Sequence, residues 1–264
     1  MSAAAALQER LAVFGDRVLD LVDRSGRFCL LAAGLVRSAR RRRFPWRETL
    51  RQFEAIGSLS LPIVLITAVF TGMVLSLQTG IALERFGAKL YVGSVVGLAL
   101  ARELGPVLTA LMVGGRVGAG ITAEIGAMQV TEQVDAIRAM GADPVQKLVL
   151  PRVAAATLAL PLLTIFADVL GALGGLAIAT SQFHISANFY LDTVYWAVTI
   201  PDVLSGIAKT FVFGWIIAMV GCFTALETTG GTVGVGRATT TAVVTASIAV
   251  LIADFFLTKA LLIL

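Results

Sequence analysis

The sequence predicts an all-α integral membrane protein with about five transmembrane helices, preceded by amphipathic helices that lie at the membrane interface. Of its 264 residues, 57% are hydrophobic and only 14% are charged, whereas about a quarter of the residues of a soluble domain are charged. The apolar runs are also long. A membrane helix requires about 20 mostly apolar residues, whereas a barrel strand is short and alternating. These observations exclude a transmembrane barrel and favour a helical bundle.

The region 1–57 has the features of helices that lie on a membrane. Apolar residues recur at helical spacing from Leu7 to Ser25, with charged residues on the opposite face. A second short apolar segment covers Phe28 to Val36, and Phe44-Pro45-Trp46 resembles an interfacial elbow with a proline at a helix start. We therefore predict N-terminal interfacial helices in residues 1–57 and a transmembrane domain in residues 58–264.

Basic residues gather just before the first long apolar run, at Arg40 to Arg43 with Arg37, Arg47 and Arg51. Such clusters mark the cytoplasmic side of a membrane protein and contact anionic lipid head groups. We expect a multi-pass protein with a cytoplasmic N-terminus and with its C-terminus on the opposite face. A nucleic-acid partner is not expected, because no exposed domain accompanies the cluster.

Five apolar segments follow, and their lengths fit membrane helices. The predicted spans cover residues 59–83, 92–113, 148–180, 203–226 and 239–264. The outside loop 181–201 is rich in aromatic residues, which suit a membrane interface and a short surface helix. A glycine-rich inside turn is expected from Thr228 to Gly236.

A ladder of small residues follows the second predicted span. Gly114, Gly118, Thr122 and Gly126 recur every four residues, a spacing that lets membrane helices approach closely. Gly115 to Thr122 has the outer spacing of a phosphate-binding loop, but Ile121 stands where its lysine must be. We therefore expect no ATP hydrolysis by this chain.

The composition also argues against a metal site and a catalytic triad. The single histidine, His184, excludes a histidine-based metal site and a Ser-His-Asp arrangement. Cys29 and Cys222 form no spaced motif. We therefore expect a chain without a catalytic site, a metal or a cofactor.

The segment 124–140 has the periodicity of an acidic amphipathic helix between the second and third spans. Glu132, Asp135 and Arg138 share one face, and Gly141 supplies a helix stop. Two interpretations remain open: a solvated loop helix, or a helix that docks into a groove on a cytoplasmic partner.

Charged residues inside the spans call for an explanation, because a charge at the centre of a membrane helix costs at least about 2.5–3.5 kcal/mol. Arg102 and Glu103 are either neutralised by neighbours or line a cavity that receives a charged head group. Lys209 could pair with Asp254, whereas Asp168 has no obvious partner. An ion-coupled carrier that uses these acidic and basic residues is the alternative function, and a membrane scaffold is a third.

Several motifs resemble the MlaE/YrbE permease family. They are GMVLSLQ at 72–78, RELGPVLTAL at 102–111, GRVGAGITAEIGAM at 115–128, TEQVDAIRAMGADP at 131–144, GRATTTAVV at 236–244 and ADFFLT at 253–258. Because they occur in order from about residue 45 to the end, the resemblance covers the whole predicted membrane domain.

The resemblance implies the membrane subunit of an ABC transporter that moves phospholipids between the inner and outer membranes of a bacterium. It implies an inner-membrane location, a cytoplasmic ABC ATPase, a periplasmic MCE-domain protein and a STAS-domain subunit as partners. ABC ATPases act in pairs and one chain offers one docking helix, so a homodimer is expected.

The resemblance also directs the choice of site residues. The expected lipid cavity is lined by Leu75, Gln78, Leu83, Phe86, Arg102, Glu103 and Leu104. The expected coupling residues toward the ATPase are Glu124, Met128, Glu132, Asp135 and Arg138.

Overall fold

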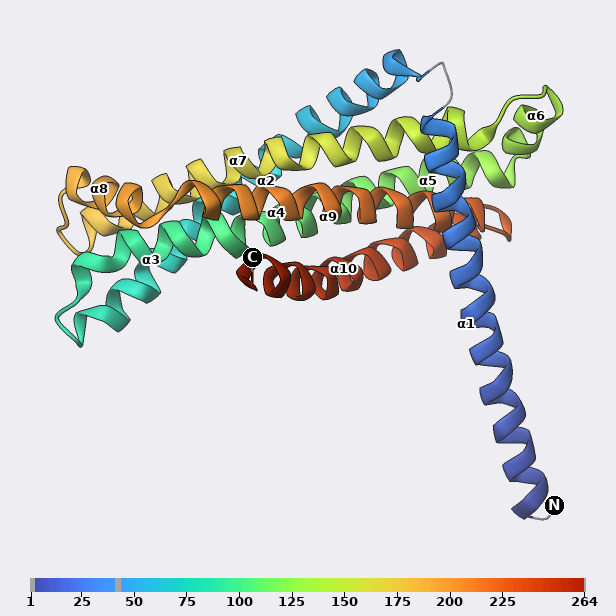
Figure 1. Ribbon diagram of the computed structural model, residues 1–264, viewed down its shortest axis with the longest axis horizontal. Coiled ribbons are helices and arrows are strands. Elements are labelled where there is room, and N and C mark those ends of the chain that lie inside the picture. Colours follow the sequence, from blue (N-terminus) through green and yellow to red (C-terminus); the bar gives the residue numbers. More distant parts are fainter. Residues whose placement is uncertain (1–2, 41–43, 264) are drawn as a thin grey trace.

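The computed structural model describes residues 3–40 and 44–263, apart from some side chains near both ends. Every regular element in this described part is helical (Figure 1). Arg41 to Arg43 of the basic cluster lie outside the described residues. So do the side chains from Leu7 to Phe14, which belong to the predicted amphipathic helix. Five helical stretches are long and apolar enough to cross a membrane, which confirms the predicted fold class. They cover Trp46–Glu84, Lys89–Val130, Val145–Ser181, Ile200–Leu226 and Gly231–Leu261.

The N-terminal region is one long helix followed by an elbow. Helix α1 (Ala3–Ala39) is continuous, so the two separate segments predicted for this region were wrong. A single interior glycine such as Gly26 costs a helix only about 1 kcal/mol, which is too little to interrupt it. Figure 1 shows α1 standing across the bundle near the end that carries α6 (Gln133–Ala139).

The elbow leads directly into the first span. Helix α2 (Trp46–Glu84) starts after Pro45, whose carbonyl accepts the backbone N–H of Thr49 at 3.0 Å. The predicted boundary between residues 57 and 58 therefore falls inside one helix. Interfacial and membrane segments join in one helix although Gly57 and Ser58 are possible stop and start signals, because one interior glycine costs only about 1 kcal/mol and the Ser58 hydroxyl donates to the Glu54 carbonyl within the helix.

The second span is longer than predicted. After a 3-10 turn (Lys89–Tyr91), it runs through α3 (Val92–Ala99), α4 (Gly105–Val113) and α5 (Ala119–Val130). Wider π-helical turns at Leu100–Leu104 and Gly114–Gly118 join these helices. The second span was predicted to end at residue 113. The helix continues beyond that residue because the small side chains of the glycine ladder keep it packed against the bundle.

The ladder packs against the fourth span, α9 (Ile200–Leu226). A Cβ atom on Gly114 would lie 3.3 Å from the Ile217 side chain, and one on Gly221 would lie 3.3 Å from the Gly118 carbonyl oxygen. Arg116, inside the ladder, donates to the Ser60 hydroxyl of α2 at 2.9 Å. This close packing and the hydrogen bond of Arg116 explain why the helix continues past residue 113.

The single helix predicted over 124–140 is two helices. Helix α5 ends at Val130, Glu132 adopts a left-handed conformation with φ of 59°, and α6 follows. The turn lets α6 bury Val134 and Ile137, which a straight continuation of α5 would carry away from the bundle. Gly141 ends α6 with φ of 74°, which confirms the predicted stop.

The remaining chain completes the bundle. A π-helical turn (Val145–Val149) leads into α7 (Leu150–Ser181), and the surface helix α8 (Ala187–Ala197) lies in the aromatic loop as expected. The last helix, α10 (Gly231–Ile263), begins at Gly231 rather than at the predicted Thr239. The chain reverses in fewer residues than predicted because Gly230 and Gly231 both take positive φ, 85° and 66°.

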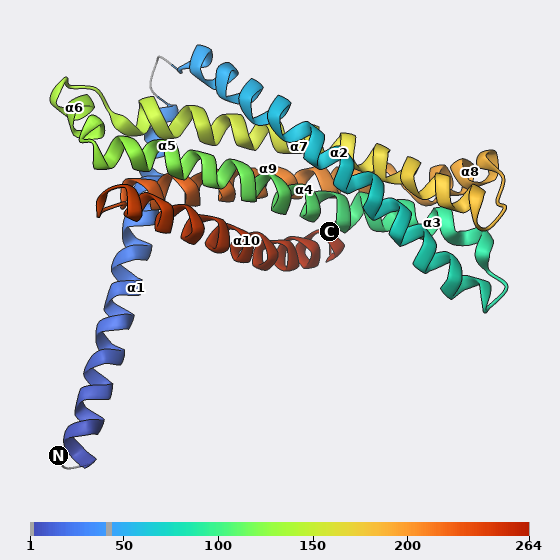
Figure 2. The same ribbon diagram turned by 180° about the vertical axis from the view of Figure 1, so that it is seen from behind.

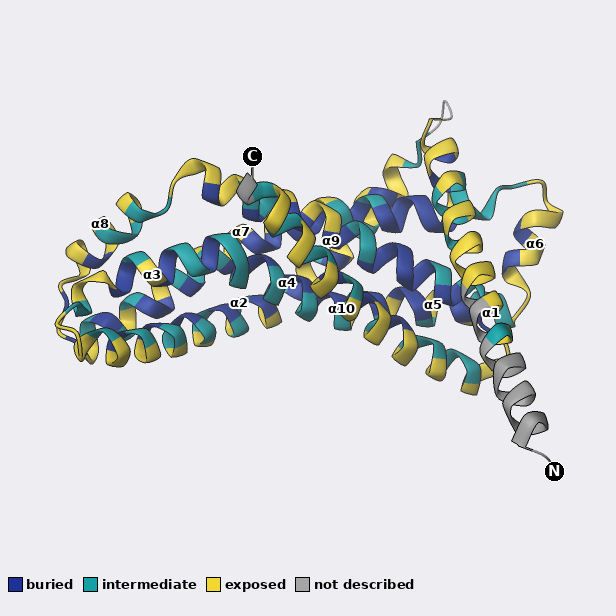
Figure 3. Cartoon of the chain, turned by 60° about the horizontal axis from the view of Figure 1, so that its bottom comes forward, coloured by how far each residue is buried: buried dark blue, intermediate teal, exposed yellow. Residues whose placement is uncertain are grey.

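Glycines bring α2 and α7 into close contact. A Cβ atom on Gly72 would collide with the backbone carbonyl of Gly171, and one on Gly174 would collide with the carbonyl of Val69. Such backbone approach is how membrane helices gain dispersion contacts in the absence of a hydrophobic driving force. Figures 2 and 3 show these helices side by side, with exposed positions on the outer surface of the bundle.

Candidate functional site

A buried ammonium group organises the charges within the membrane-spanning bundle. Lys209 of α9 is 2% exposed, and its Nζ lies 2.8 Å from Glu103 Oε2 and 3.3 Å from Asp254 Oδ1. It also donates to the Thr258 hydroxyl at 2.7 Å. Lys209 and Asp254, expected from the sequence to be partners, are thus joined by a second carboxylate from the second span. One cation and two carboxylates from three helices form what we call the Lys209 cluster.

The local backbone explains how Lys209 reaches the second span. Pro106 has no N–H, so the carbonyl of Arg102 lacks its usual partner in an α-helix. Lys209 Nζ donates to that carbonyl at 3.1 Å. The π-helical turn at Leu100–Leu104 widens the helix at the same place, as π turns frequently do at functional sites.

Arg102 and Glu103 do not pair with each other. Arg102 reaches Asp202 at the start of α9, with its Nη2 2.6 Å from Oδ1 and its Nε 2.7 Å from the same oxygen. The other oxygen of Asp202 accepts the backbone N–H of Thr199 at 2.9 Å, which completes a capping box. Sequence reasoning missed Asp202, although a Thr-x-x-Asp pattern at a helix start was a usable signal.

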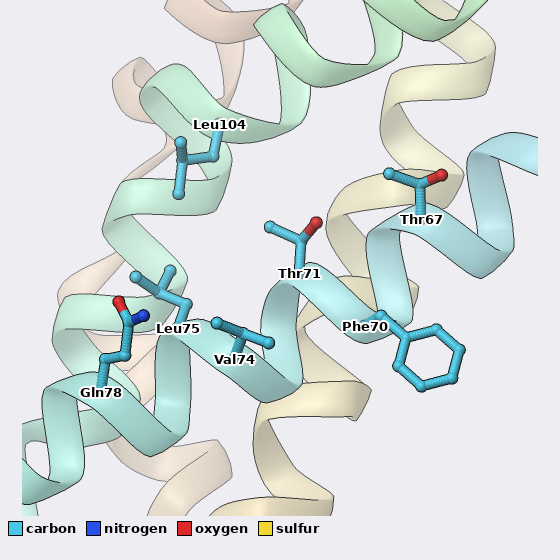
Figure 4. Close-up of a pocket in the computed structure, with 7 residues that line it drawn as sticks. All are labelled: Thr67, Phe70, Thr71, Val74, Leu75, Gln78 and Leu104. Atoms are coloured by element: carbon cyan, nitrogen blue, oxygen red, sulfur yellow. The ribbon is translucent and has the colours of Figure 1, made fainter.

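Two hollows flank this turn of the second span. The first, of about 410 Å³, lies between α2 and Leu104 and is drawn in Figure 4. Its walls are mostly apolar, with three polar side chains: Thr67, Thr71 and Gln78. In Figure 4, Thr71 and Leu75 face Leu104, whereas Phe70 points away from it. We call this hollow the α2 trough; its lining residues are Thr67, Phe70, Thr71, Val74, Leu75, Gln78 and Leu104.

The second hollow, of about 220 Å³, contains the charges. Arg102, Glu103, Asp202, Lys209 and Thr258 contribute to its lining. The residues expected to line one cavity are divided between two hollows, an apolar one that includes Leu75, Gln78 and Leu104 and a charged one that includes Arg102 and Glu103. Glu103 lines the charged hollow and the next residue of the same turn, Leu104, lines the apolar one.

Two residues expected in the cavity line neither hollow. Leu83 packs against the buried cluster of α3 and α8 that contains Val96 and Tyr190. Phe86 lies in the turn after α2 and is 83% exposed. Their assignment to the lipid cavity stays a prediction that the two hollows do not support.

The predicted coupling residues at the other end of the bundle separate into two groups. Glu132, Asp135 and Arg138 are exposed on or beside α6, and the last two form an ion pair of 2.8 Å. The opposite face of α6 is buried through Val134 and Ile137. Helix α6 is thus anchored by its apolar face and presents a charged face outward.

Glu124 and Met128 lie on α5 rather than α6, and Glu124 is also exposed. Glu124 Oε2 lies 2.9 Å from Nη2 of Arg152, a residue of α7 that is only 5% exposed. Arg152 also donates to the Leu148 carbonyl at 2.8 Å. Met128 is half-buried and packs against the core. The ion pair joins the end of α5 to α7, the helices that precede and follow α6 in the chain.

Asp168 stands apart from the Lys209 cluster. It lies in α7 against Gly105, where an added Cβ atom would collide with its Oδ1. That oxygen is buried and has no hydrogen-bond partner among the described residues. The described residues also contain no group of histidine, cysteine and acidic side chains that could hold a metal.

Comparison with known proteins places these features in a family. Residues 49–260 match the family model described as Permease MlaE. The chain is 40% identical over 245 residues to a "Probable ABC transporter permease protein" of Rickettsia bellii (strain RML369-C), covering 93% of this chain and 95% of the relative. A Synechocystis sp. protein of the same description is 46% identical over 211 residues, 80% of each chain. The "Intermembrane phospholipid transport system permease protein MlaE" of Haemophilus influenzae is 35% identical over 254 residues, 94% of this chain and 95% of the relative.

Proposed function

Because this chain belongs to the MlaE permease family and is a multi-pass membrane permease of an ABC transporter, we propose that it moves phospholipid between two membranes. One observation carries the proposal: an apolar trough and a hollow lined by charges are both lined by the turn of the second span that holds Arg102, Glu103 and Leu104. A phospholipid has the same two parts, a charged head group and long apolar chains. The name of the Haemophilus influenzae relative supports this substrate class.

The two hollows divide the lipid between them in this proposal. The phosphate of the head group lies near the Arg102 guanidinium, which is part-exposed to the charged hollow. An acyl chain follows the α2 trough past Leu75 and Leu104. Lys209 stays paired with Glu103 and Asp254 and holds α9, the second span and α10 in register.

Energy comes from a separate ATPase in this account. The GRVGAGIT segment lacks the phosphate-binding lysine and lies in the packed ladder against α9. The exposed charged face of α6 is the docking element, and Glu132 and Asp135 are the contacts we assign to it. The Glu124–Arg152 pair then connects movement of α6 to α7.

The assembly is proposed as a homodimer in a bacterial inner membrane, with the α1 and α6 end in the cytoplasm. Two copies supply the two docking elements that a pair of ATPases requires. An MCE-domain protein on the periplasmic side and a STAS-domain subunit beside the ATPase complete the proposed complex. The ion-coupled alternative is less favoured, because Lys209 already holds both Glu103 and Asp254 in ion pairs and Asp168 forms no described hydrogen bond or ion pair with them.

Reversal of charge on α6 tests the docking assignment. In the double variant Glu132→Lys and Asp135→Lys, recovery of the ATPase with the tagged permease should fall by about tenfold or more, because like charges opposed across an interface cost several kcal/mol. Both side chains are exposed, so the yield and melting temperature of the permease itself should not change.

The matched control reverses two exposed acids at the other end of the bundle, Glu84→Lys and Asp192→Lys. This control should retain the ATPase fully. Normal recovery of the ATPase with the α6 variant, or equal loss with the control, would contradict the assignment of α6 as the docking element.

A further inference from the structure

A second amphipathic groove lies at the α6 end of the bundle, beyond the proposed cavity. It runs between α1, the last turns of α9 and the first turns of α10, and two adjoining hollows of about 410 and 310 Å³ form it. Arg24, Thr224 and Thr241 line both hollows. We call it the α1 groove.

The two halves of the α1 groove differ in polarity. The inner half is lined by apolar groups, including Phe28, Val220 and Phe223. The Phe28 ring meets the Phe223 ring edge to face, with centroids 5.4 Å apart. The outer half lies where α9 ends and α10 begins. It is lined by Thr228, Thr229 and Arg237 together with Glu227.

The charge of the outer half is positive. Glu227 is shared by two guanidinium groups, with Arg24 Nε at 3.2 Å and Arg27 Nε at 2.9 Å. Arg27 also pairs with Asp23 at 3.1 Å. Arg237 is exposed and forms no ion pair with any described residue. Among the described side chains that line the outer half, Arg24 and Arg237 stand against Glu227 alone, which leaves one positive charge in excess, carried by Arg237.

The position of the groove relative to a bilayer identifies its occupant. Helix α1 crosses the bundle rather than following it (Figure 1), and large apolar side chains of α1 such as Leu19, Val22 and Leu30 are exposed. A helix of this kind lies in the plane of the head groups with its apolar face toward the acyl chains. The polar half of the groove is then at head-group level and the apolar half is below it.

We propose that the α1 groove binds one anionic phospholipid from the surrounding bilayer. Its phosphate lies between Arg24 and Arg237, beside the threonine hydroxyls, and one acyl chain follows Phe28, Val220 and Phe223. A second copy of the chain would have to desolvate Arg237 to cover the same groove, whereas a phosphate neutralises it. The bound lipid joins α1 to α9 and α10 without occupying the α2 trough.

Melting temperatures of the purified chain test this site, since a ligand that binds only the folded state raises them. Phosphatidylglycerol added to micelles should raise the melting temperature more than phosphatidylcholine does. Arg237→Gln should lose most of this difference, and its own fold should be intact because Arg237 has no described partner. Arg85→Gln, an exposed arginine without a described ion pair at the other end of the bundle, should keep the difference.

Cys29 gives a second readout, because it lines the groove and is exposed whereas Cys222 is buried. A fluorophore on Cys29 should be quenched by phosphatidylglycerol with brominated chains, and less so in Arg237→Gln.

Four outcomes would overturn the proposal. They are equal effects of the two lipids, an unchanged response in Arg237→Gln, the same shift with inorganic phosphate alone, and quenching of the Cys29 fluorophore that is as strong in Arg237→Gln as in the wild type. None of them bears on the α2 trough, so the transport proposal stands or fails separately.

Discussion

Lys209→Met is expected to abolish transport and to lower the melting temperature sharply. The substitution removes the only cation that contacts both Glu103 and Asp254 among the described residues. Breaking a fully buried ion pair costs about 3–5 kcal/mol; the part-exposed Glu103 and Asp254 should lose less than this, although a membrane-spanning segment offers little water to compensate. It also leaves the Arg102 carbonyl without its donor. Thermal unfolding in detergent and lipid transfer from proteoliposomes measure the two effects.

Two comparisons separate charge from packing. Lys259→Met, on the exposed side of α10, should leave both measurements near the wild-type values. Adding Glu103→Gln and Asp254→Asn to Lys209→Met should restore much of the melting temperature, because no unpaired charge then remains. A Lys209→Met protein with normal stability and normal transport would contradict the role given to the cluster.

Gly72→Val is expected to prevent correct folding. A Cβ atom on Gly72 would collide with the Gly171 backbone, so α2 and α7 would have to move apart along their contact. Overpacking typically costs about 1–3 kcal/mol and more where backbone must shift. Size-exclusion chromatography of the detergent extract should show loss of the monodisperse peak.

Gly57→Val is the matched control because it makes the same change in the same helix. A Cβ atom on Gly57 would meet nothing within 4 Å, so the only other change is in helix propensity, which is slightly higher for valine than for glycine. The control should elute like the wild type. If both variants elute normally, close α2–α7 contact is not what holds the bundle together.

Hydropathy and periodicity were sufficient for the fold class, because the length of an apolar run is a local property. The positions at which helices end were harder to predict from the sequence. Arg116 seemed to end the second span, since its partner Ser60 lies 56 positions away and only the fold brings them together. The left-handed Glu132 could not be foreseen either, because helical periodicity continues across it.

The candidate site could likewise be predicted only in part. The cost of an isolated membrane charge pointed to Lys209 and Asp254, which lie 3.3 Å apart. The partners of Arg102 and Glu103 could not be chosen in this way, since Asp202 is 100 positions from Arg102. Glu124 was assigned to docking because the resemblance implies a coupling helix over 124–140, and nothing in the sequence indicated its ion pair with Arg152, which lies 28 positions away.

Photo-crosslinking of lipid inside the assembled transporter tests the central claim, that a motor on another chain controls a lipid site in this one. Photoreactive residues at Leu75 and Gln78 report the α2 trough, and Phe166 and Leu173 on the exposed side of α7 report bulk lipid. Trapping the ATPase in its closed state should reduce labelling at Leu75 and Gln78 and leave the two α7 positions unchanged. Labelling of the trough that is the same in the open and trapped states would contradict the claim.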